Sequence, residues 1–193
     1  MKLNSQEIRN CLSTKETRKM LEEMVKLDSF KNSTNNSVSS TRMADKELAL
    51  RFAGFYMLDE NLIDIEYRSD MDWFLDRVTD SLNKQPASVK ERIISQFDIA
   101  LTNAHLLFNN RAFRKTTQIN KSLFLSWTRL LRKYSTKEIE KIDNNIIKEK
   151  LKSRIDADTS YYYAISYATN DALNIQRAYY VAKEILEECL NES

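Results

Sequence analysis

Four polar residues crowd the start of the chain, in the stretch QEIRN. Gln6, Glu7, Arg9 and Asn10 are interrupted only by Ile8. A guanidinium pairs with a carboxylate or a phosphate through its fork of N–H donors, and the neighbouring amides and carboxylate add further donors and acceptors. The stretch therefore indicates either a capped surface helix or one half of a polar site whose other half lies elsewhere.

A second concentration of polar chemistry is the segment RAFRKTTQINK, residues 111–121. Its cations are Arg111, Arg114, Lys115 and Lys121, and a helix is expected to begin at its end. Helix N-termini, arginines and lysines all favour phosphate and other anions. The segment is a candidate anion or nucleic-acid contact.

Other side chains give little sign of catalysis. His105 is the only histidine and has no second ligand at metal-binding spacing, so we expect no metal site and no Ser-His-Asp triad. Gly54 is the only glycine, which excludes a glycine-rich phosphate loop. The neighbouring carboxylates are interpreted as structural: Glu22 and Glu23, Asp70 and Asp72, Glu187 and Glu188. We therefore assign no catalytic residue and expect no cofactor.

Tyrosines are frequent in the last third of the chain. They are Tyr161, Tyr162, Tyr163, Tyr167, Tyr179 and Tyr180. Buried tyrosine rings with hydroxyls at the rim are the ordinary explanation. Beside Arg154 and Arg177, the same rings could stack on nucleic-acid bases.

Bulk composition limits the class of protein. The chain has 193 residues, which is enough for one domain. Its net charge of +2 is no marked basic excess. Its N-terminus lacks the apolar region of a signal peptide, and no apolar run reaches bilayer length. Cys11 and Cys189 lie nearly a chain length apart, and we expect them to be reduced. These features favour a cytoplasmic protein without a membrane segment.

The elements that must position these residues are expected to be helices. One glycine and one proline, Pro86, are too few for the turns of a sheet protein. Capping-box spacing predicts helix starts at Asn4, Ser13, Ser88 and Ser135. Asp45 should begin the central buried helix, because the next residues through Leu58 are largely apolar. Single helices are also expected over residues 135–156 and, at the end of the chain, from 171 to Leu190.

The fold expected is an all-α single domain over residues 1–193, with about eight helices. The polar stretch at 31–42 is predicted to be a flexible loop. A short extended segment near 62–67 stays open as an alternative to irregular structure.

Five segments, in order, resemble the N-terminal domain family of GmrSD-type restriction endonucleases, which are ParB/Srx-like nucleases. LNSQEIRNCL resembles the family pattern LNxQEIRNA, and RMADKELALRFAGFYML resembles its RxxDxELVLRFLAF helix. ISQFDIALTNAHLLFNNRAFRK, INKSLFLSWTRLL and SYYYAISYATNDALNIQRAYYVAKEIL resemble its three later motifs. The collinear matches cover residues 3 to 186 and correspond to the family's C-terminal helical portion.

The resemblance carries over eight residues by motif: Gln6, Glu7, Arg9, Asn10, Arg51, Arg114, Asn120 and Lys121. It implies that the first four pack near the family's DGQQR site in complete proteins, where Arg9 would meet a phosphate or a carboxylate supplied from outside this chain. The interface or phosphate-contact candidates are Gln6, Glu7, Arg9, Asn10 and Arg51. The nucleic-acid-contact candidates are Arg111, Arg114, Lys115, Asn120 and Lys121.

The sequence also departs from the family. The FQRxYVW and DGQQR segments of its ParB-like region, credited with nucleotide hydrolysis or nuclease chemistry, do not occur here, and neither does an HNH domain. The family's Thr-Gly turn is replaced by Ala168, Thr169 and Asn170, where Asn170 could accept a positive φ.

The resemblance therefore implies a helical, non-catalytic portion of a GmrSD-like restriction or phage-defence protein. Such a portion would act as a scaffold or as a module that contacts DNA or a ParB-like catalytic domain or chain. The alternative is a stand-alone nucleotide-dependent nuclease of the same family, and a purely structural helical remnant is a third interpretation. The oligomeric state, the nucleic-acid target and any nucleotide specificity stay open.

Overall fold

The computed structural model describes residues 2–192 and is all-helical in that part of the chain. It contains eleven α-helices rather than about eight, with two short 3-10 turns, η1 (Thr41–Met43) and η2 (Asn109–Arg111). The helices are α1 (Ser5–Leu12), α2 (Lys15–Lys26), α3 (Asp28–Thr34), α4 (Ala44–Asp59), α5 (Met71–Lys84), α6 (Ala87–Phe108), α7 (Lys121–Leu131), α8 (Thr136–Ile139), α9 (Asn144–Ala157), α10 (Thr159–Ala164) and α11 (Ala172–Asn191). The predicted all-α class is confirmed.

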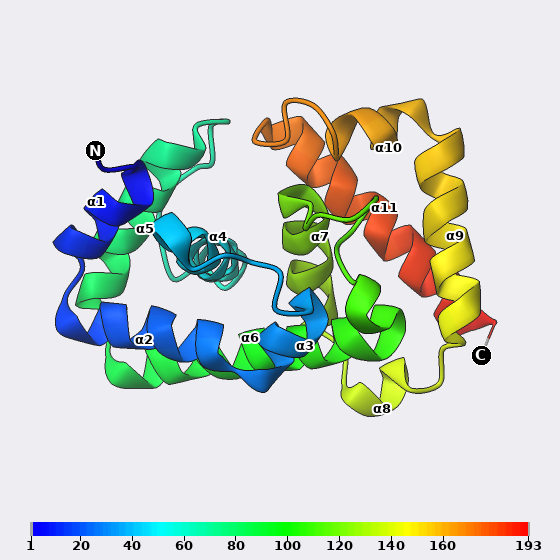
Figure 1. Cartoon of the computed structure of the whole chain (residues 1–193), viewed down its shortest axis with the longest axis horizontal. Helices are drawn as coiled ribbons and strands as arrows, with labels where there is room; N and C mark the ends of the chain where they lie inside the picture. Colours follow the sequence, from blue (N-terminus) through cyan, green and yellow to red (C-terminus); the bar gives the residue numbers. More distant parts are fainter. Residues whose placement is uncertain (1, 193) are drawn as a thin grey trace.

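The long helix α6 runs along one side of the molecule and connects two groups of helices (Figure 1). Helices α1, α2 and α5 gather at one end, and α9, α10 and α11 gather at the other. Helix α6 packs on α2, α3 and α7, while α4 passes through the interior against α2, α5 and α7. The two groups therefore share one hydrophobic core.

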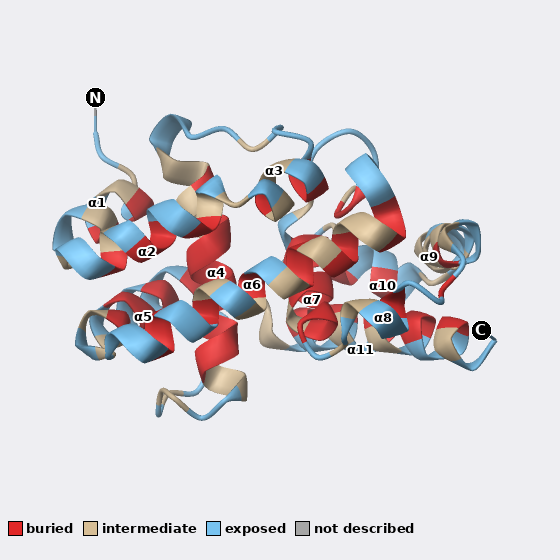
Figure 2. Cartoon of the chain, turned by 90° about the horizontal axis from the view of Figure 1, so that it is seen from below, coloured by how far each residue is buried: buried red, intermediate tan, exposed pale blue. Residues whose placement is uncertain are grey.

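Helix α4 is the central helix, as the sequence predicts. Every residue from 48 to 57 is buried, and the burial colouring of Figure 2 shows α4 buried through its middle, with half-buried residues towards its ends. A helix that is apolar on all sides is stable only inside a core. Gly54 permits its close approach to α5, because an added Cβ would lie 2.8 Å from Phe74 Cε1 and 2.8 Å from Val78 Cγ2.

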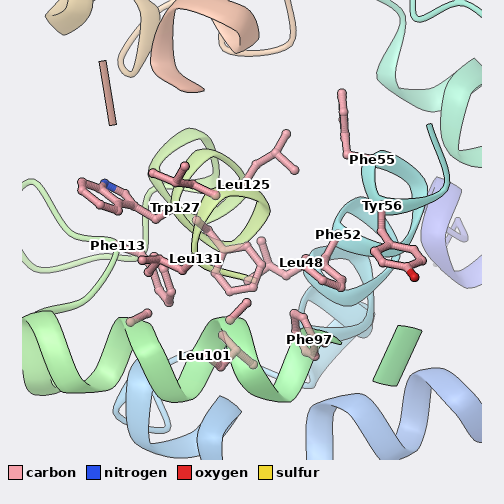
Figure 3. Close-up of a cluster of buried hydrophobic side chains, with 14 of the residues drawn as sticks. Leu48, Phe52, Phe55, Tyr56, Phe97, Leu101, Phe113, Leu125, Trp127 and Leu131 are labelled. Carbon is pink, nitrogen blue, oxygen red and sulfur yellow. The ribbon is translucent and has the colours of Figure 1, made fainter. Parts of the chain in front are cut away.

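Aromatic rings join the helices in the centre of the core (Figure 3). Phe97 of α6 lies 4.8 Å from Phe52 of α4 and 6.2 Å from Phe124 of α7, measured between ring centroids. Phe113, in the loop after η2, lies 4.8 Å from Phe124. These contacts hold three helices and one loop around a common point.

Two of the four predicted capping boxes are present. Asn4 and Ser135 both accept a hydrogen bond from the backbone of a glutamate three residues later, and each glutamate bonds back. Helix α2 is instead capped by Thr14, and α6 starts directly after Pro86, whose fixed φ suits a helix start. The starts expected at Ser13 and Ser88 are therefore wrong by one or two residues.

Three predicted segments differ from the structure. Residues 31–34 belong to helix α3 rather than to a flexible loop, because Phe30 inserts into the core and Thr34 bonds back to its carbonyl oxygen at 2.6 Å. Residues 62–67 form no strand; Tyr67 instead packs its ring 5.3 Å from Phe55. The single helix expected over 135–156 is divided into α8 and α9, where Asp143 caps the second helix.

The final helix begins as predicted, with Asp171 accepting bonds from the backbone of the first turn. Cys11 on α1 is exposed and Cys189 on α11 is buried. Helix α1 and the C-terminal end of α11 lie at opposite ends of the molecule (Figure 1). Within residues 2–192, no helix is both long and apolar enough to cross a membrane.

Candidate functional site

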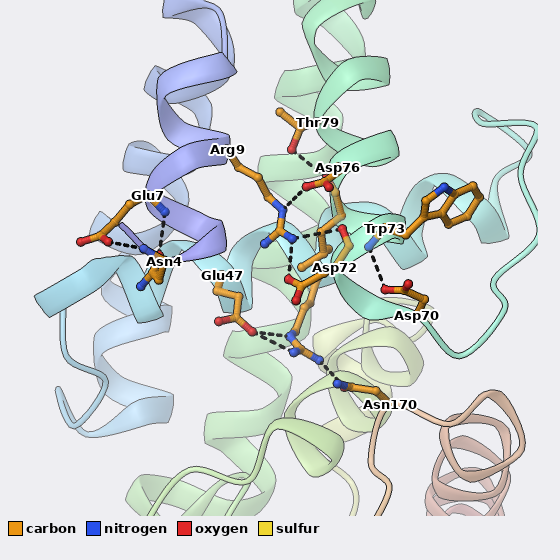
Figure 4. Close-up of polar contacts among 12 residues, drawn as sticks. Asn4, Glu7, Arg9, Glu47, Asp70, Asp72, Trp73, Asp76, Thr79 and Asn170 are labelled. Atoms are coloured by element: carbon orange, nitrogen blue, oxygen red, sulfur yellow. Dashed lines mark hydrogen bonds and ion pairs between the residues drawn. The ribbon is translucent and has the colours of Figure 1, made fainter. Parts of the chain in front are cut away.

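Arg9 is a residue of α1, and its side chain pairs with carboxylates of α5 in this same chain. Its Nη2 donates to Asp72 Oδ1 at 2.5 Å and to the Asp72 carbonyl at 3.0 Å, and its Nε donates to Asp76 Oδ1 at 2.7 Å (Figure 4). Asp72 and Asp76 are one turn apart on α5 and so share the face that meets α1. The expectation that the partner of Arg9 lies outside the chain is therefore wrong.

Glu7 is engaged at the start of α1. One of its carboxylate oxygens accepts from the backbone of Asn4 at 2.7 Å and from Arg42 at 3.1 Å. Both bonds fix the entry of the chain into the first helix. Glu7 thus has a complete structural role as a capping residue.

Gln6 is the polar residue of α1 that this local structure leaves unexplained. It is 3% exposed, and neither its amide nitrogen nor its amide oxygen has a partner among the described residues. The Asn10 side-chain oxygen is also buried without a partner. Buried amides are normally hydrogen-bonded, so these atoms are the unusual polar groups of the QEIRN stretch.

Arg51 is the charged residue within the buried run 48–57 of α4. Its Nε donates to Glu47 Oε1 at 2.9 Å, and its Nη1 donates to Asn170 Oδ1 at 3.0 Å (Figure 4). Lys121, at the start of α7, reaches the same Glu47 oxygen at 2.9 Å. Residues from the second, fourth and fifth family-like segments therefore meet at one place.

The sequence motifs do not predict Asn170 as a site residue, although the altered turn at 168–170 indicates that this part of the chain differs from the family. The positive φ of that turn is at Ala168, with φ 45°, and not at Asn170. The main-chain oxygen of Asn170 also accepts a short hydrogen bond from the Tyr67 hydroxyl. Asn170 thus holds the loop before α11 against α4 and the segment before α5.

A polar pocket of about 530 Å³ opens between the starts of α1 and α5 and the side of α4. Its lining comprises Asn4, Ser5, Gln6, Arg9, Glu47, Arg51, Ser69, Asp70, Met71, Asp72 and Asn170. The lining holds two arginines and three carboxylates, and both arginines bind carboxylates within it or beside it. The pocket consequently offers no unpaired excess of positive charge for a phosphate.

The pKa values of the carboxylates agree with this pairing. The hydrogen bond from Arg9 lowers the pKa of Asp72 below its usual value, against a smaller opposing effect of burial. Burial acts to raise the pKa of Glu47, but Arg51 and Lys121 together outweigh it and hold that pKa below its usual value. Both groups are therefore kept in the charged form that binds the cations.

Arg114 is occupied by the chain itself. It donates to the carbonyl oxygens of Asn110, Ala112 and Thr117 and, across the loop, to the carbonyl oxygen of Thr34 at 2.6 Å. This geometry favours a structural role that joins the 111–121 segment to α3. Asn120 is likewise structural: its side chain caps α7 and donates to the Ile165 carbonyl at 2.6 Å.

Of the other cations of the segment, Arg111 and Lys121 are exposed and Lys115 is half-buried. Lys115 donates to Ser166 Oγ and lies 4.4 Å from the centroid of the Tyr162 ring. Arg111 is exposed and has no ion pair within the described residues. Among the candidate nucleic-acid contacts, Arg114 and Asn120 are thus structural, and Lys121 belongs to the cluster around Glu47. Arg111 and Lys115 are the candidates that remain at the surface of the segment.

His105 is half-buried near the end of α6. No group of three histidine, cysteine, aspartate or glutamate side chains placed to hold a metal ion occurs between residues 2 and 192.

Comparisons with protein-family models, curated proteins and solved structures found no match to this chain.

Proposed function

We propose that this chain is a non-catalytic helical module that contacts a partner protein through α1. The observation that carries the proposal is the inverted orientation of this helix. Gln6 and Arg9 are its buried side chains, whereas Ile8 is 47% exposed and Leu12 is 68% exposed. An amphipathic surface helix normally turns its apolar side to the core.

The apolar surface of α1 consists of Ile8, Cys11 and Leu12, which follow helical spacing, with Leu3 nearby in sequence. Contiguous exposed apolar groups rimmed by charge are typical of protein–protein contacts. Because the buried side of α1 is held by the Arg9 ion pairs, the helix cannot turn this surface inward without breaking them. The outward position is therefore a stable property of the fold.

The partner that best fits the proposal is a ParB-like catalytic domain or chain of a GmrSD-like restriction or phage-defence system. Its support is the resemblance of five ordered segments, together with the meeting of motif residues from three of them around Glu47. The internal pairing of Arg9 and Arg51 favours the module over a stand-alone nuclease, because neither guanidinium is left for a nucleotide phosphate.

The contact is tested by mixing the pure chain with a ParB-like domain that carries the FQRxYVW and DGQQR segments. We expect a complex in which Cys11 reacts more slowly with a maleimide, and which Ile8→Asp with Leu12→Asp disrupts. Ile146→Asp is the matched control, because Ile146 is 41% exposed on α9, which lies at the other end of the molecule from α1 (Figure 1). Unchanged Cys11 reactivity, or equal disruption by the control, would contradict the proposal.

The nuclease alternative is tested on the isolated chain with Mg²⁺. We expect neither hydrolysis of GTP or ATP nor cleavage of plasmid DNA. Hydrolysis that disappears in Arg9→Ala, while the helical circular-dichroism signal is retained, would establish the alternative instead.

A further inference from the structure

Three tyrosine rings form an exposed cluster at α10 and the turn that follows it. Tyr162 is 41% exposed, Tyr163 is 51% exposed and Tyr167 is 57% exposed. The Tyr167 ring centroid lies 5.5 Å from that of Tyr163 and 6.5 Å from that of Tyr162. We call these three residues the tyrosine platform.

The fold forces these rings outward. Helix α10 buries Tyr161 and Ala164, so the two tyrosines between them must face away from the core. The chain then turns back, and the Tyr167 amide donates to the Tyr163 carbonyl at 2.8 Å. The turn brings the third ring beside the other two, which sequence spacing alone does not require.

The basic segment 111–121 lies directly beside the tyrosine platform. Lys115 reaches both Ser166 and the Tyr162 ring, and Asn120 bonds the carbonyl oxygen of Ile165. Residues 111–121 hold four cations and no acidic residue, and residues 159–170 hold no charged residue. Burial, and then the charge of Arg111, lower the pKa of Arg114 in the same segment.

We propose that the tyrosine platform and the adjacent cation Lys115 bind single-stranded nucleic acid. Unpaired bases stack on exposed aromatic rings whatever their sequence, and nearby lysines and arginines neutralise the backbone phosphates. A duplex keeps its bases stacked internally and cannot use the rings in this way. None of these residues belongs to α1, so the inference does not depend on the proposed partner contact.

The first test is fluorescence anisotropy with labelled oligo(dT) and oligo(rU) strands of about 20 nucleotides, which is longer than typical single-strand sites. We expect Tyr167→Ala to weaken binding about tenfold or more, and Tyr167→Phe to retain it, because phenylalanine stacks without the hydroxyl. The matched control is Tyr180→Ala, since Tyr180 is 52% exposed on α11 outside the platform. The two strands distinguish DNA from RNA as the preferred source of the same chemistry.

The second test measures the salt dependence of the same binding. Lys115→Gln should reduce the slope of log affinity against log salt by about 0.7 for each backbone phosphate that the lysine neutralises. Absence of binding at low salt, equal binding of a duplex, or equal weakening by Tyr180→Ala would each overturn the inference. Circular dichroism of every variant separates a loss of binding from a loss of folding.

Discussion

The guanidinium of Arg9 is buried, whereas the two carboxylates that pair with it are exposed. Its side chain is 3% exposed, whereas those of Asp72 and Asp76 are 71% and 63% exposed. The carboxylates remain hydrated while the guanidinium is covered by α1 and α5. Such a bridge orients the helix more than it stabilises the fold, because solvent screens its exposed half.

The Asp72 side of this bridge gives a pH-dependent prediction. Arg9 lowers the folded-state pKa of Asp72 below 3.8, so the pairing adds stability above that value and loses it as pH falls through the folded pKa. Asp72→Asn should therefore be less stable than the parent near neutral pH, by less than about 1 kcal/mol. The difference should vanish in strong acid.

Urea unfolding at a series of pH values measures this effect. Asp80→Asn serves as the control, because Asp80 is an exposed residue of α5 with no ion pair among the described residues. A constant difference between Asp72→Asn and the parent across the acid range would show that the bridge makes no contribution.

Ala168 carries the other residue-scale prediction. Its φ of 45° lies in the left-handed region, where a Cβ is unfavourable and glycine is not. Ala168→Gly should raise the free energy of unfolding by about 0.5–1 kcal/mol, since the relief of strain exceeds the added chain entropy. Chemical denaturation checks it, with Ala157→Gly at the exposed end of α9 expected to change stability in the opposite direction.

At the scale of elements, the packing of α4 on α5 determines the polar pocket, since α4 carries Glu47 and Arg51 and α5 carries Asp72. The two helices approach closely at Gly54, where Phe74 and Val78 fill the space of a side chain. A helix interior disfavours glycine, so its presence in α4 is explained by contact rather than by propensity.

Gly54→Ala should consequently destabilise the protein. Overpacking should cost about 1–3 kcal/mol, and the better helix propensity of alanine should offset about 1 kcal/mol of that cost. Val78→Ala should partly rescue it by vacating one of the two contacts. A double-mutant cycle from urea denaturation measures this coupling. Additive effects of the two substitutions would show that the contact is relieved elsewhere.

At the scale of the whole molecule, rings from α3, α4 and α7 meet a ring of α6 in the core between the two groups of helices. Phe97 is fully buried and contacts Phe30, Phe52 and Phe124 with centroid distances of 6.0, 4.8 and 6.2 Å. Because α3, α4 and α7 all meet this ring, the ends of the molecule should unfold together.

Phe97→Ala tests this cooperativity. We expect it to lower the free energy of unfolding by about 3–5 kcal/mol, the usual cost of emptying a phenylalanine site in a core. In a Trp73→Phe background Trp127 is the remaining tryptophan, and its fluorescence should change together with the helical circular dichroism. Two separated transitions would show that the helix groups unfold independently.

The sequence by itself determined the features that depend on neighbours along the chain. The scarcity of glycine and proline indicated helices, and the apolar run after Asp45 indicated the buried α4. Asn4 and Ser135 identified helix starts, because a cap bonds a backbone group only three residues away. Most of the secondary structure was therefore predictable, apart from breaks such as the one between α8 and α9.

Only the tertiary structure decided what the polar residues bind. Arg9 meets carboxylates 63 and 67 residues away, and Arg51 meets Asn170 at a separation of 119 residues. The QEIRN stretch predicted that the partner of Arg9 lies outside the chain, but the packing of α1 on α5 brings Asp72 and Asp76 to it. The side chains around the pocket and at the tyrosine platform are brought together by long-range burial, and no local spacing along the chain encodes which of them will meet.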